Sequence, residues 1–531
     1  MFIRNFAHCN KKMIGFMRKF YELRALMMFI MFFLLSKSSL FAQINLTATA
    51  GTATGSYTTI SGAFAAINAG THQGNIIISI DGNTTEPASP VYLGASGVST
   101  ALYNSVLIKP SVVATVSGTP NAGAAVINFN GSDNVILDGS ITVGGTTRDL
   151  TITNTNLNTI ANSACIRLVG QTTAGTGLAL SNFTIKNTIL IGHTPGNNGT
   201  SGSTVTTSYG IYAGSNTLTS MLNTATGANY DNLSITNNEI KKAYIGIYVA
   251  GGVSPNQNDN LLINQNLIGS STQSDQVGFK GIFASQTTTG TITENNVFSV
   301  KSTTSTSPVG IEIAGTASTA VTVSRNRVEG IYSESLSGYG AYGINLVGGN
   351  NHMLVNNVIT DVRTINYSAT STTFNAFGIR ITSGTGHKIY YNSVNLFGDY
   401  TLSSTFASGA TAAAFCVTST AVTGLDIKNN IFSNKITSSY ATKEFHAVWF
   451  PTAYNFLNAT LNYNYYGIPA DGYHFVGKVG LTVGTGNYLS LNNWQAISQV
   501  NNATNDVESE PVSNTVVPFT TNLDLTIPAG T

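Results

Sequence analysis

Cysteine is nearly absent from this chain. The 531 residues include only three cysteines, Cys9, Cys165 and Cys416. About eight of the repeats described below separate Cys165 from Cys416. This distance is far beyond disulfide reach and excludes a disulfide scaffold. The chain also lacks a cysteine and histidine spacing that matches a zinc site. Backbone pairing and core packing therefore have to hold the fold together.

Charged residues are also scarce, at 9% of the chain. Residues 1–42 hold seven of the 24 basic residues and one of the 23 acidic residues, which leaves 17 basic and 22 acidic residues and a net charge of −5 for the remainder. A protein that binds nucleic acid needs a basic stripe, so this class is excluded. Hydrophobic residues make up 42% of the chain and recur at fixed positions, which excludes intrinsic disorder.

Long hydrophobic runs are missing except for Ala25–Leu35, which spans 11 residues. Basic residues precede this run, and small residues follow it up to Ala42. Because the run is too short to span a membrane comfortably, the pattern predicts a cleaved secretory signal peptide over residues 1–42. We expect export through the Sec pathway, a secreted or cell-surface location, and no stable membrane span after cleavage. An uncleaved signal anchor is the alternative.

An asparagine that follows an apolar residue by three positions recurs through the chain, as in VTVSRNRV at 321–328. The predicted ladder consists of Asn238, Asn266, Asn295, Asn326, Asn356, Asn392, Asn430 and Asn464. Its steps are 28 to 38 residues long, and self-similarity at this period is typical of a stacked repeat fold. We expect each amide to bond the next coil, which makes the ladder structural.

A second element, which we call the Gly-Ile strand, lies between the asparagines. It reads GIYVA at 246–250, GIEIAG at 310–315 and GIRI at 378–381. Both elements alternate with period two and are bounded by Gly, Asn, Ser and Thr, as β-strands are. The sequence therefore predicts an all-β fold, a right-handed parallel β-helix of about twelve coils.

The chain divides into four parts. Residues 1–42 are the signal peptide, residues 43–74 an N-terminal cap, residues 75–466 the β-helix repeats and residues 467–531 a C-terminal closing region. Within the cap, Ser61–Gly70 is expected to form a short helix that has Ser61 as its N-cap and covers the first coil. A second helix is expected over Leu489–Ser498.

These features together resemble the secreted right-handed parallel β-helix proteins of pectin-lyase-like fold that are common in Bacteroidetes. The resemblance is carried by LFAQ at 40–43, the cap sequence YTTISGAFAAINAG, the coil GSDNVILDGS, the repeats and the tail segments NYLSLNNWQ and DVESEPV. It covers nearly all of the chain after residue 42 and implies the fold and an extracellular location. Members of this group often continue into further modules and a sorting domain for type IX secretion.

One outward residue of each Gly-Ile strand stacks in a column along a β-helix. The part of this column that could bind a ligand comprises Tyr212, Tyr248, Phe283, Glu312, Asn345 and Arg380. Aromatic rings stack on sugar rings and the polar groups can bond hydroxyls, so this column is a candidate saccharide track. The alternative is that the rings pack beneath neighbouring loops.

His352, Lys388 and Asp426 form the candidate catalytic column. A base, a cation and a carboxylate on successive coils could abstract a proton next to a uronate, as a lyase does. The alternative is a surface ion pair between Lys388 and Asp426. Pectate lyases of this fold hold calcium with clustered acidic residues, and here we expect no two aspartates to stack on adjacent coils. Neither a metal nor another cofactor is therefore predicted.

Two functional hypotheses follow. The first is a secreted or cell-surface rod without catalytic activity, which serves adhesion or polysaccharide binding. The second is a carbohydrate-active enzyme, a polysaccharide lyase or glycoside hydrolase that acts on an acidic polysaccharide. The weak candidate site favours the first. We expect a monomer whose partner is a polysaccharide or a cell-surface glycan.

Overall fold

The computed structural model describes Arg24 and residues 42–156, 162–170, 179–193, 208–215, 227–303, 306–335, 339–365, 372–399 and 409–511. The chain splits into two units, Met1–Ala42 and Gln43–Thr531. Apart from Arg24 and Ala42, the predicted signal peptide lies outside the described residues, so it stays a prediction. Within those ranges, no helix is both long enough and apolar enough to cross a membrane.

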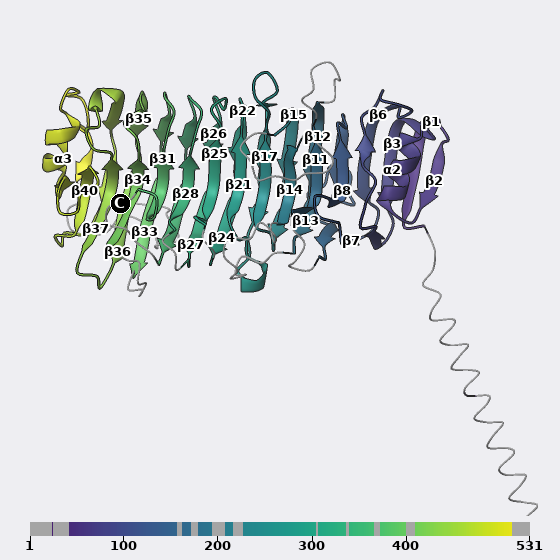
Figure 1. Cartoon of the computed structure of the whole chain (residues 1–531), viewed down its shortest axis with the longest axis horizontal. Helices are drawn as coiled ribbons and strands as arrows, with labels where there is room; N and C mark the ends of the chain where they lie inside the picture. Colours follow the sequence, from purple (N-terminus) through teal and green to yellow (C-terminus); the bar gives the residue numbers. More distant parts are fainter. Residues whose placement is uncertain are drawn as a thin grey trace, which may run out of the picture. The chain divides into compact units, whose positions relative to one another are not determined.

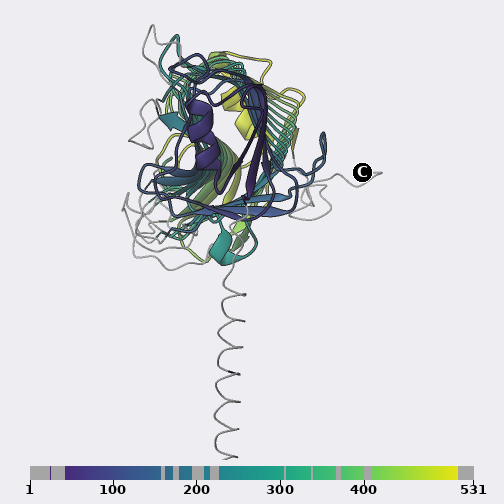
Figure 2. The same ribbon diagram turned by 90° about the vertical axis from the view of Figure 1, so that its right-hand side faces the viewer.

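The second unit is built from three sheets that wind around one interior (Figures 1 and 2). In the described part of the chain the first sheet has 16 strands and the other two have 13 each. Successive strands join the first, second and third sheet in turn and pair in parallel with the previous coil. The expected right-handed parallel β-helix is confirmed.

The strands of each sheet have the following bounds. The first sheet contains β1 (Ile44–Gly51), β2 (Thr54–Tyr57), β3 (His72–Ile80), β6 (Tyr103–Pro110), β9 (Val135–Asp138), β12 (Leu180–Lys186), β15 (Tyr230–Thr236), β18 (Asn258–Asp259), β19 (Leu262–Asn264), β22 (Thr287–Thr288), β23 (Thr291–Thr293), β26 (Thr322–Ser324), β29 (Met353–Val355), β32 (Lys388–Tyr390), β35 (Leu425–Lys428) and β38 (Ala459–Asn462). The second contains β4 (Thr84–Glu86), β7 (Ala114–Gly118), β10 (Leu150–Asn154), β13 (Thr188–Ile191), β16 (Glu239–Lys241), β20 (Leu267–Ile268), β24 (Asn296–Ser302), β27 (Arg327–Ser333), β30 (Val358–Thr364), β33 (Ser393–Asp399), β36 (Ile431–Thr437), β39 (Tyr465–Gly467) and β42 (Glu510–Pro511). The third contains β5 (Leu93–Gly94), β8 (Ala125–Asn130), β11 (Ser163–Val169), β14 (Ser208–Ser215), β17 (Ile245–Ala250), β21 (Lys280–Ser285), β25 (Val309–Ala314), β28 (Ala341–Leu346), β31 (Ala376–Ile381), β34 (Ala410–Val417), β37 (Lys443–Phe450), β40 (His474–Val479) and β41 (Asn487–Tyr488).

A helix covers each end of the coil stack: α2 (Ile60–Asn68) the first coils and α3 (Leu491–Ser498) the last (Figure 1). The expectation that Ser61 is the N-cap of the first helix is wrong. Thr59 has the extended backbone of an N-cap, and its hydroxyl accepts a hydrogen bond from the Gly62 N–H. Ser61 already belongs to the first turn, and its hydroxyl accepts from the Val91 N–H instead, at 2.6 Å.

The expected end of the repeats at residue 466 is too early. Strand β40 pairs in parallel with β37, and β42 pairs in parallel with β39, so two sheets continue beyond that residue. The sequence of β40, HFVGKV, lacks the Gly-Ile pattern, which is why the repeat is hidden there. At the other end, β1 pairs antiparallel with both β2 and β3, a hairpin that the repeat pattern does not indicate.

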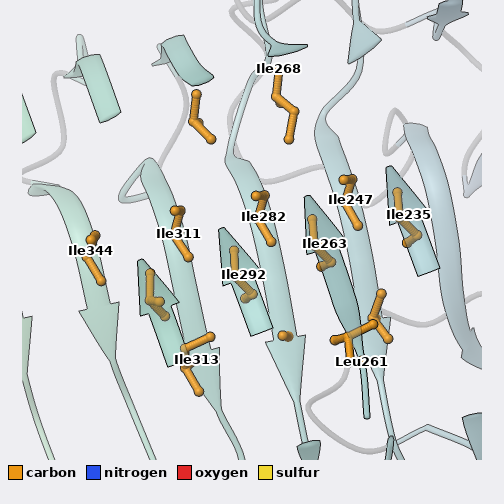
Figure 3. Close-up of a cluster of buried hydrophobic side chains, with 14 of the residues drawn as sticks. Ile235, Ile247, Leu261, Ile263, Ile268, Ile282, Ile292, Ile311, Ile313 and Ile344 are labelled. Carbon is orange, nitrogen blue, oxygen red and sulfur yellow. The ribbon is translucent and has the colours of Figure 1, made fainter. Parts of the chain in front are cut away.

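Isoleucine columns fill the interior, as Figure 3 shows. Ile247, Ile282, Ile311 and Ile344 are register partners on successive coils, and all are fully buried. Each such side chain contributes about 1.5–3 kcal/mol by leaving water. The glycine of the Gly-Ile strand also has a packing reason: a Cβ on Gly281 would lie 2.3 Å from Val297 Cγ1 and 2.6 Å from the Gly310 carbonyl oxygen.

The asparagine ladder bridges three coils at a time. The Asn266 amide donates to the Asn295 side-chain oxygen on the next coil and to the Ile235 carbonyl on the previous one, both at 2.9 Å. The same Asn295 oxygen also accepts from the Asn266 backbone N–H, at 3.0 Å. Seven of the eight predicted asparagines occupy this place, all with 0–1% of their surface exposed: Asn238, Asn266, Asn295, Asn326, Asn392, Asn430 and Asn464.

The eighth ladder position is Asn357 and not Asn356. Asn357 is fully buried and donates to the Val323 carbonyl at 2.8 Å and to the Asn392 side-chain oxygen at 2.9 Å. Asn356 is exposed and has a φ of +56°, which places it in the left-handed turn just before the ladder. The buried apolar residue three positions before the ladder amide is Leu354, whereas Met353 is only partly buried.

Two substitutions of adjacent residues test this assignment. Asn357→Ala removes buried hydrogen bonds on both sides of one coil, and we expect a loss of at least about 3 kcal/mol, since each unpaired buried group costs about 1–3 kcal/mol. Asn356→Gly should leave stability unchanged or raise it slightly, because glycine adopts a positive φ readily. Chemical denaturation of both variants measures the difference. Equal effects of the two changes would contradict the assignment of Asn357 to the ladder.

Candidate functional site

The candidate saccharide column is continuous in the third sheet. Strand register pairs the six residues in the expected order: Tyr212, Tyr248, Phe283, Glu312, Asn345 and Arg380. The stacking of one residue from each coil therefore agrees with the pattern of the Gly-Ile strand.

The aromatic part of this column is buried, so the expectation of an exposed stacking surface is wrong. Tyr212 and Tyr248 are 0% exposed and Phe283 is 3% exposed. The Tyr212 and Tyr248 rings stack at 5.1 Å with 3° between their planes, and the Tyr248 and Phe283 rings at 4.8 Å with 14°. Together with Tyr209 and Ile245 they form a second hydrophobic cluster, separate from the interior core.

The polar part of the column forms a chain of bonds along the coil stack. Lys280, a residue absent from the predicted site, lies 2.7 Å from Glu312 Oε1 and 4.3 Å from the centre of the Phe283 ring. The Asn345 amide donates to Glu312 Oε2 at 2.9 Å. Arg380 donates to the Asn345 oxygen at 3.2 Å and lies 4.7 Å above the Tyr342 ring. These groups bind one another, so a sugar would have to displace existing bonds.

The candidate catalytic column is broken at its first member. Strand register pairs Lys388 with Met353 and Asp426, so His352 lies one position out of the column. Its side chain is fully buried and stacks on His387, with 5.1 Å between the ring centres and 13° between the planes. The equivalent residue on the preceding coil, Val321, is also a buried core residue.

Both imidazoles of this pair have a fixed tautomer. The backbone N–H of Val321 donates to His352 Nδ1 at 3.2 Å. The backbone N–H of His352 in turn donates to His387 Nδ1 at 3.3 Å. The proton of each ring is therefore on Nε2. His352 Nε2 donates to the Gly348 carbonyl, and His387 Nε2 donates to the Ser383 carbonyl. Burial, followed by the neighbouring His387, lowers the pKa of His352 to about 4. Both rings are neutral structural groups.

Lys388 and Asp426 are register neighbours, but the expected ion pair between them does not occur in the described structure. Asp426 instead pairs with Lys428 on its own strand, at 3.0 Å, and accepts a hydrogen bond from the Tyr390 hydroxyl. Asp426 and Lys428 are two residues apart on β35 and therefore project from the same face. Lys388 is exposed.

Two aspartates do stack on adjacent coils, contrary to expectation. Asp231 and Asp259 are register partners of β15 and β18. Burial, with Asp259 and Asp133 nearby, raises the pKa of Asp231. However, among the residues that the structure describes, no three His, Cys, Asp or Glu side chains come together in a way that suits a metal ion.

A buried ionic cluster that the sequence does not reveal lies near the last coils. Lys478 is fully buried, and its amine lies 2.6 Å from Glu444 Oε2 and 3.1 Å from the Asn487 side-chain oxygen. Glu444 also accepts from the Asn487 amide at 2.9 Å. Burial, followed by Lys478, lowers the pKa of His446 beside them to about 3. The cluster ties β41 and the segment before it to β37 and β40.

A pocket of about 330 Å³ lies beside α3 and is lined in part by Asp471, His474 and Ser490. Asp471 holds His474 Nδ1 at 2.8 Å, a pairing that also occurs in hydrolases. The Ser490 hydroxyl is the N-cap of α3. It accepts from the Asn493 N–H at 3.2 Å and donates to the Asn493 side chain at 2.8 Å.

Comparison with solved structures finds distant likenesses. The Dettilon tailspike protein is 14% identical, with a TM-score of 0.45, and the match covers 79% of this chain but only 64% of the tailspike. PfbA, a surface adhesin of Streptococcus pneumoniae, is 14% identical with a TM-score of 0.38, and 72% of this chain and 88% of that chain are covered. The A-module of the mannuronan C-5 epimerase AlgE4 of Azotobacter vinelandii is 13% identical with a TM-score of 0.33, and the covered shares are 76% and 90%. No family model and no curated protein matches the sequence.

The buried aromatic column makes a stability prediction. Tyr212→Ala combined with Tyr248→Ala should destabilise the protein by about 3–5 kcal/mol for each ring, as truncation of a buried aromatic residue does. Tyr463→Asn is the matched control, because Tyr463 is 54% exposed and its loss should change stability little. Denaturant titration compares the variants. An unchanged midpoint for the double variant would show that the two rings face water.

The histidine pair makes a pH prediction. The folded pKa of His352 is about 4, below the ordinary value of about 6.5, so the unfolded chain takes up the proton first as pH falls. Stability should therefore decrease between about pH 6.5 and pH 4, and His352→Gln should flatten this slope by about 1.4 kcal/mol per pH unit.

Unfolding free energies measured across this pH range test that change in slope. Burial also lowers the pKa values of His193 and His446, so the unfolding free energy of the variant should still depend on pH to some extent. Lys388→Gln on the outer face serves as the control and should retain the wild-type slope. The same slope in His352→Gln and in the wild type would show that His352 titrates normally.

Proposed function

We propose that this protein is a secreted or cell-surface β-helix rod without catalytic activity, which binds polysaccharide or adheres to a glycan-covered surface. The observation that supports this proposal is that the fold itself uses His352 and Asp426 of the candidate catalytic column and Glu312 of the candidate saccharide column. His352 is a neutral core residue, Asp426 is held by Lys428 and Tyr390, and Glu312 is held by Lys280 and Asn345. A general base has to reach the proton it removes, and these groups are already committed to other partners.

The repeat itself also fits a binding role. Each coil presents an equivalent set of outward positions at a spacing of about 4.8 Å, which gives a long surface of regular pitch. A linear polysaccharide also presents the same groups at a regular pitch, so many weak contacts can add along its length. Secretion or display at the cell surface, which the amino-terminal 42 residues favour, would give such a surface access to glycans.

The proposal predicts binding without turnover. The full-length chain, incubated with a panel of neutral and uronate-containing polysaccharides, should be retained by at least one of them. It should release neither reducing ends nor unsaturated products. Lys388→Ala should bind as the wild type does, since Lys388 has no chemical role in this proposal.

Products that accumulate with the wild type and vanish with Lys388→Ala would favour the alternative, a carbohydrate-active enzyme acting on an acidic polysaccharide. Failure to bind any polysaccharide would contradict the proposal itself.

A further inference from the structure

Three residues at one corner of the rod form a surface that we call the tyrosine ridge: Tyr391, Asn429 and Tyr463. Each directly follows one of the register-paired residues Tyr390, Lys428 and Asn462, which end strands β32, β35 and β38. The three residues therefore occupy equivalent positions on three successive coils. Tyr391 is 55% exposed, Tyr463 is 54% exposed and Asn429 is also exposed.

The fold does not explain the choice of tyrosine at these positions. Tyr391 has a φ of +55° and Tyr463 a φ of +56°, in the left-handed region that favours glycine and asparagine. Other coils place asparagine, glutamine, glutamate or arginine at this corner, as at Asn356, Gln265, Glu294 and Arg325. A tyrosine is less favourable there than asparagine, and with more than half of its surface in water it gains little from burial. The fold specifies the left-handed backbone at this corner but leaves the side chain free to vary, and residues held in this conformation are often associated with function.

We propose that the tyrosine ridge binds a neutral, β-1,4-linked glycan chain that lies along the rod axis. Tyr391 and Tyr463 are two coils apart, which separates them by about 9–10 Å. In an extended β-1,4-linked chain every second sugar has the same orientation, so the repeat is two sugar residues long and close to this separation. Each tyrosine stacks on one face of such a sugar, and the Asn429 amide between them bonds the hydroxyls of the intervening residue.

The charges around the ridge favour a neutral ligand over a uronate. Asp426 and Lys428 neutralise each other in an ion pair at 3.0 Å. Exposed charges of both signs flank the ridge: Lys388 on β32, and Glu508, whose backbone N–H donates to the Asn462 side chain at 2.8 Å. A polyuronate needs a surplus of positive charge, which this surface does not offer.

This inference rests on the proposed polysaccharide-binding function and names its site and ligand class. Isothermal titration of the full-length chain with cellohexaose, a neutral β-1,4-linked hexamer, tests it directly. A mannuronate hexamer, which has the same linkage but carries carboxylates, tests the charge preference, and α-1,4-linked maltohexaose tests the linkage.

The decisive variant is Tyr391→Asn combined with Tyr463→Asn, because asparagine already occupies this corner in other coils and should preserve the fold. Affinity for cellohexaose should fall about tenfold for each ring removed, the equivalent of about 1.4 kcal/mol. Glu294→Asn changes the same corner position three coils before Tyr391, outside the ridge, and should bind as the wild type does. Thermal melting should show all variants to be folded.

Each other result overturns a defined part of this inference. Equal binding by the wild type and the double variant would remove the ridge as the site while leaving polysaccharide binding intact. Preference for the mannuronate hexamer would overturn the neutral class, and preference for maltohexaose would overturn the extended linkage. If the wild-type chain binds none of the three hexamers but binds another polysaccharide, this inference alone is overturned. A chain that binds none at all would overturn the proposed function with it.

Discussion

The stack of coils depends on one side-chain amide at the same turn of each coil. Parallel strands pair their backbone groups with the neighbouring coils, but the turn between the first and second sheet leaves groups that the strands do not satisfy. The amide of Asn266 supplies the missing partners on both sides, to the Ile235 carbonyl and the Asn295 oxygen. Hydroxyl groups end the ladder: Thr188 donates to Asn238 at the first rung, and Ser509 accepts from the Asn464 N–H at the last.

The two end helices are held by the same device, a buried carboxylate. At the first coils Glu86 accepts the N–H groups of Ile60 and Ser61, at 2.8 and 2.9 Å, which are unpaired donors of the first turn of α2. At the last coils Asp506 accepts from the Trp494 indole at 2.9 Å and from the Tyr466 hydroxyl at 2.6 Å. Burial raises the pKa of Glu86 to about 7, and its two backbone bonds oppose that shift. A parallel stack has open edges, so capping groups at both ends protect it from pairing with other chains.

Much of this fold can be predicted from the sequence because the repeat determines it. Period-two alternation gives the strands, and the spacing of the asparagines gives the coils. Two of the errors are shifts by a single residue. The ladder residue is Asn357 and not its neighbour Asn356, and the residue in register with Lys388 is Met353 and not its neighbour His352. The sequence pattern fits both members of each pair, but adjacent residues point to opposite faces. The end of the repeats is missed because β40 retains strand pairing after its Gly-Ile pattern is lost.

Burial of the candidate site could not be predicted in the same way. An outward position on a strand faces water only where no other residues pack over it. The column pattern does not indicate whether such residues are present. Ile136 on β9 and Tyr212 on β14 both point outward from a strand, yet Ile136 is 40% exposed and Tyr212 is fully buried. Tyr212 is covered by an aromatic cluster that includes Tyr209, Tyr248 and Phe283.

The distribution of buried and exposed groups also shows where such a rod can acquire a binding function. The interior columns are fixed by packing and the third-sheet column by its stacked rings and ionic chain, so substitution there disturbs neighbours on two coils. At the corner before the ladder the fold specifies a left-handed backbone but leaves the side chain in water. Gln265, Glu294, Arg325 and Tyr391 all occupy this position with φ values of 53–56°. One conformation thus accommodates an amide, both charges and an aromatic ring, which makes the corner the place where the surface can change without changing the coil.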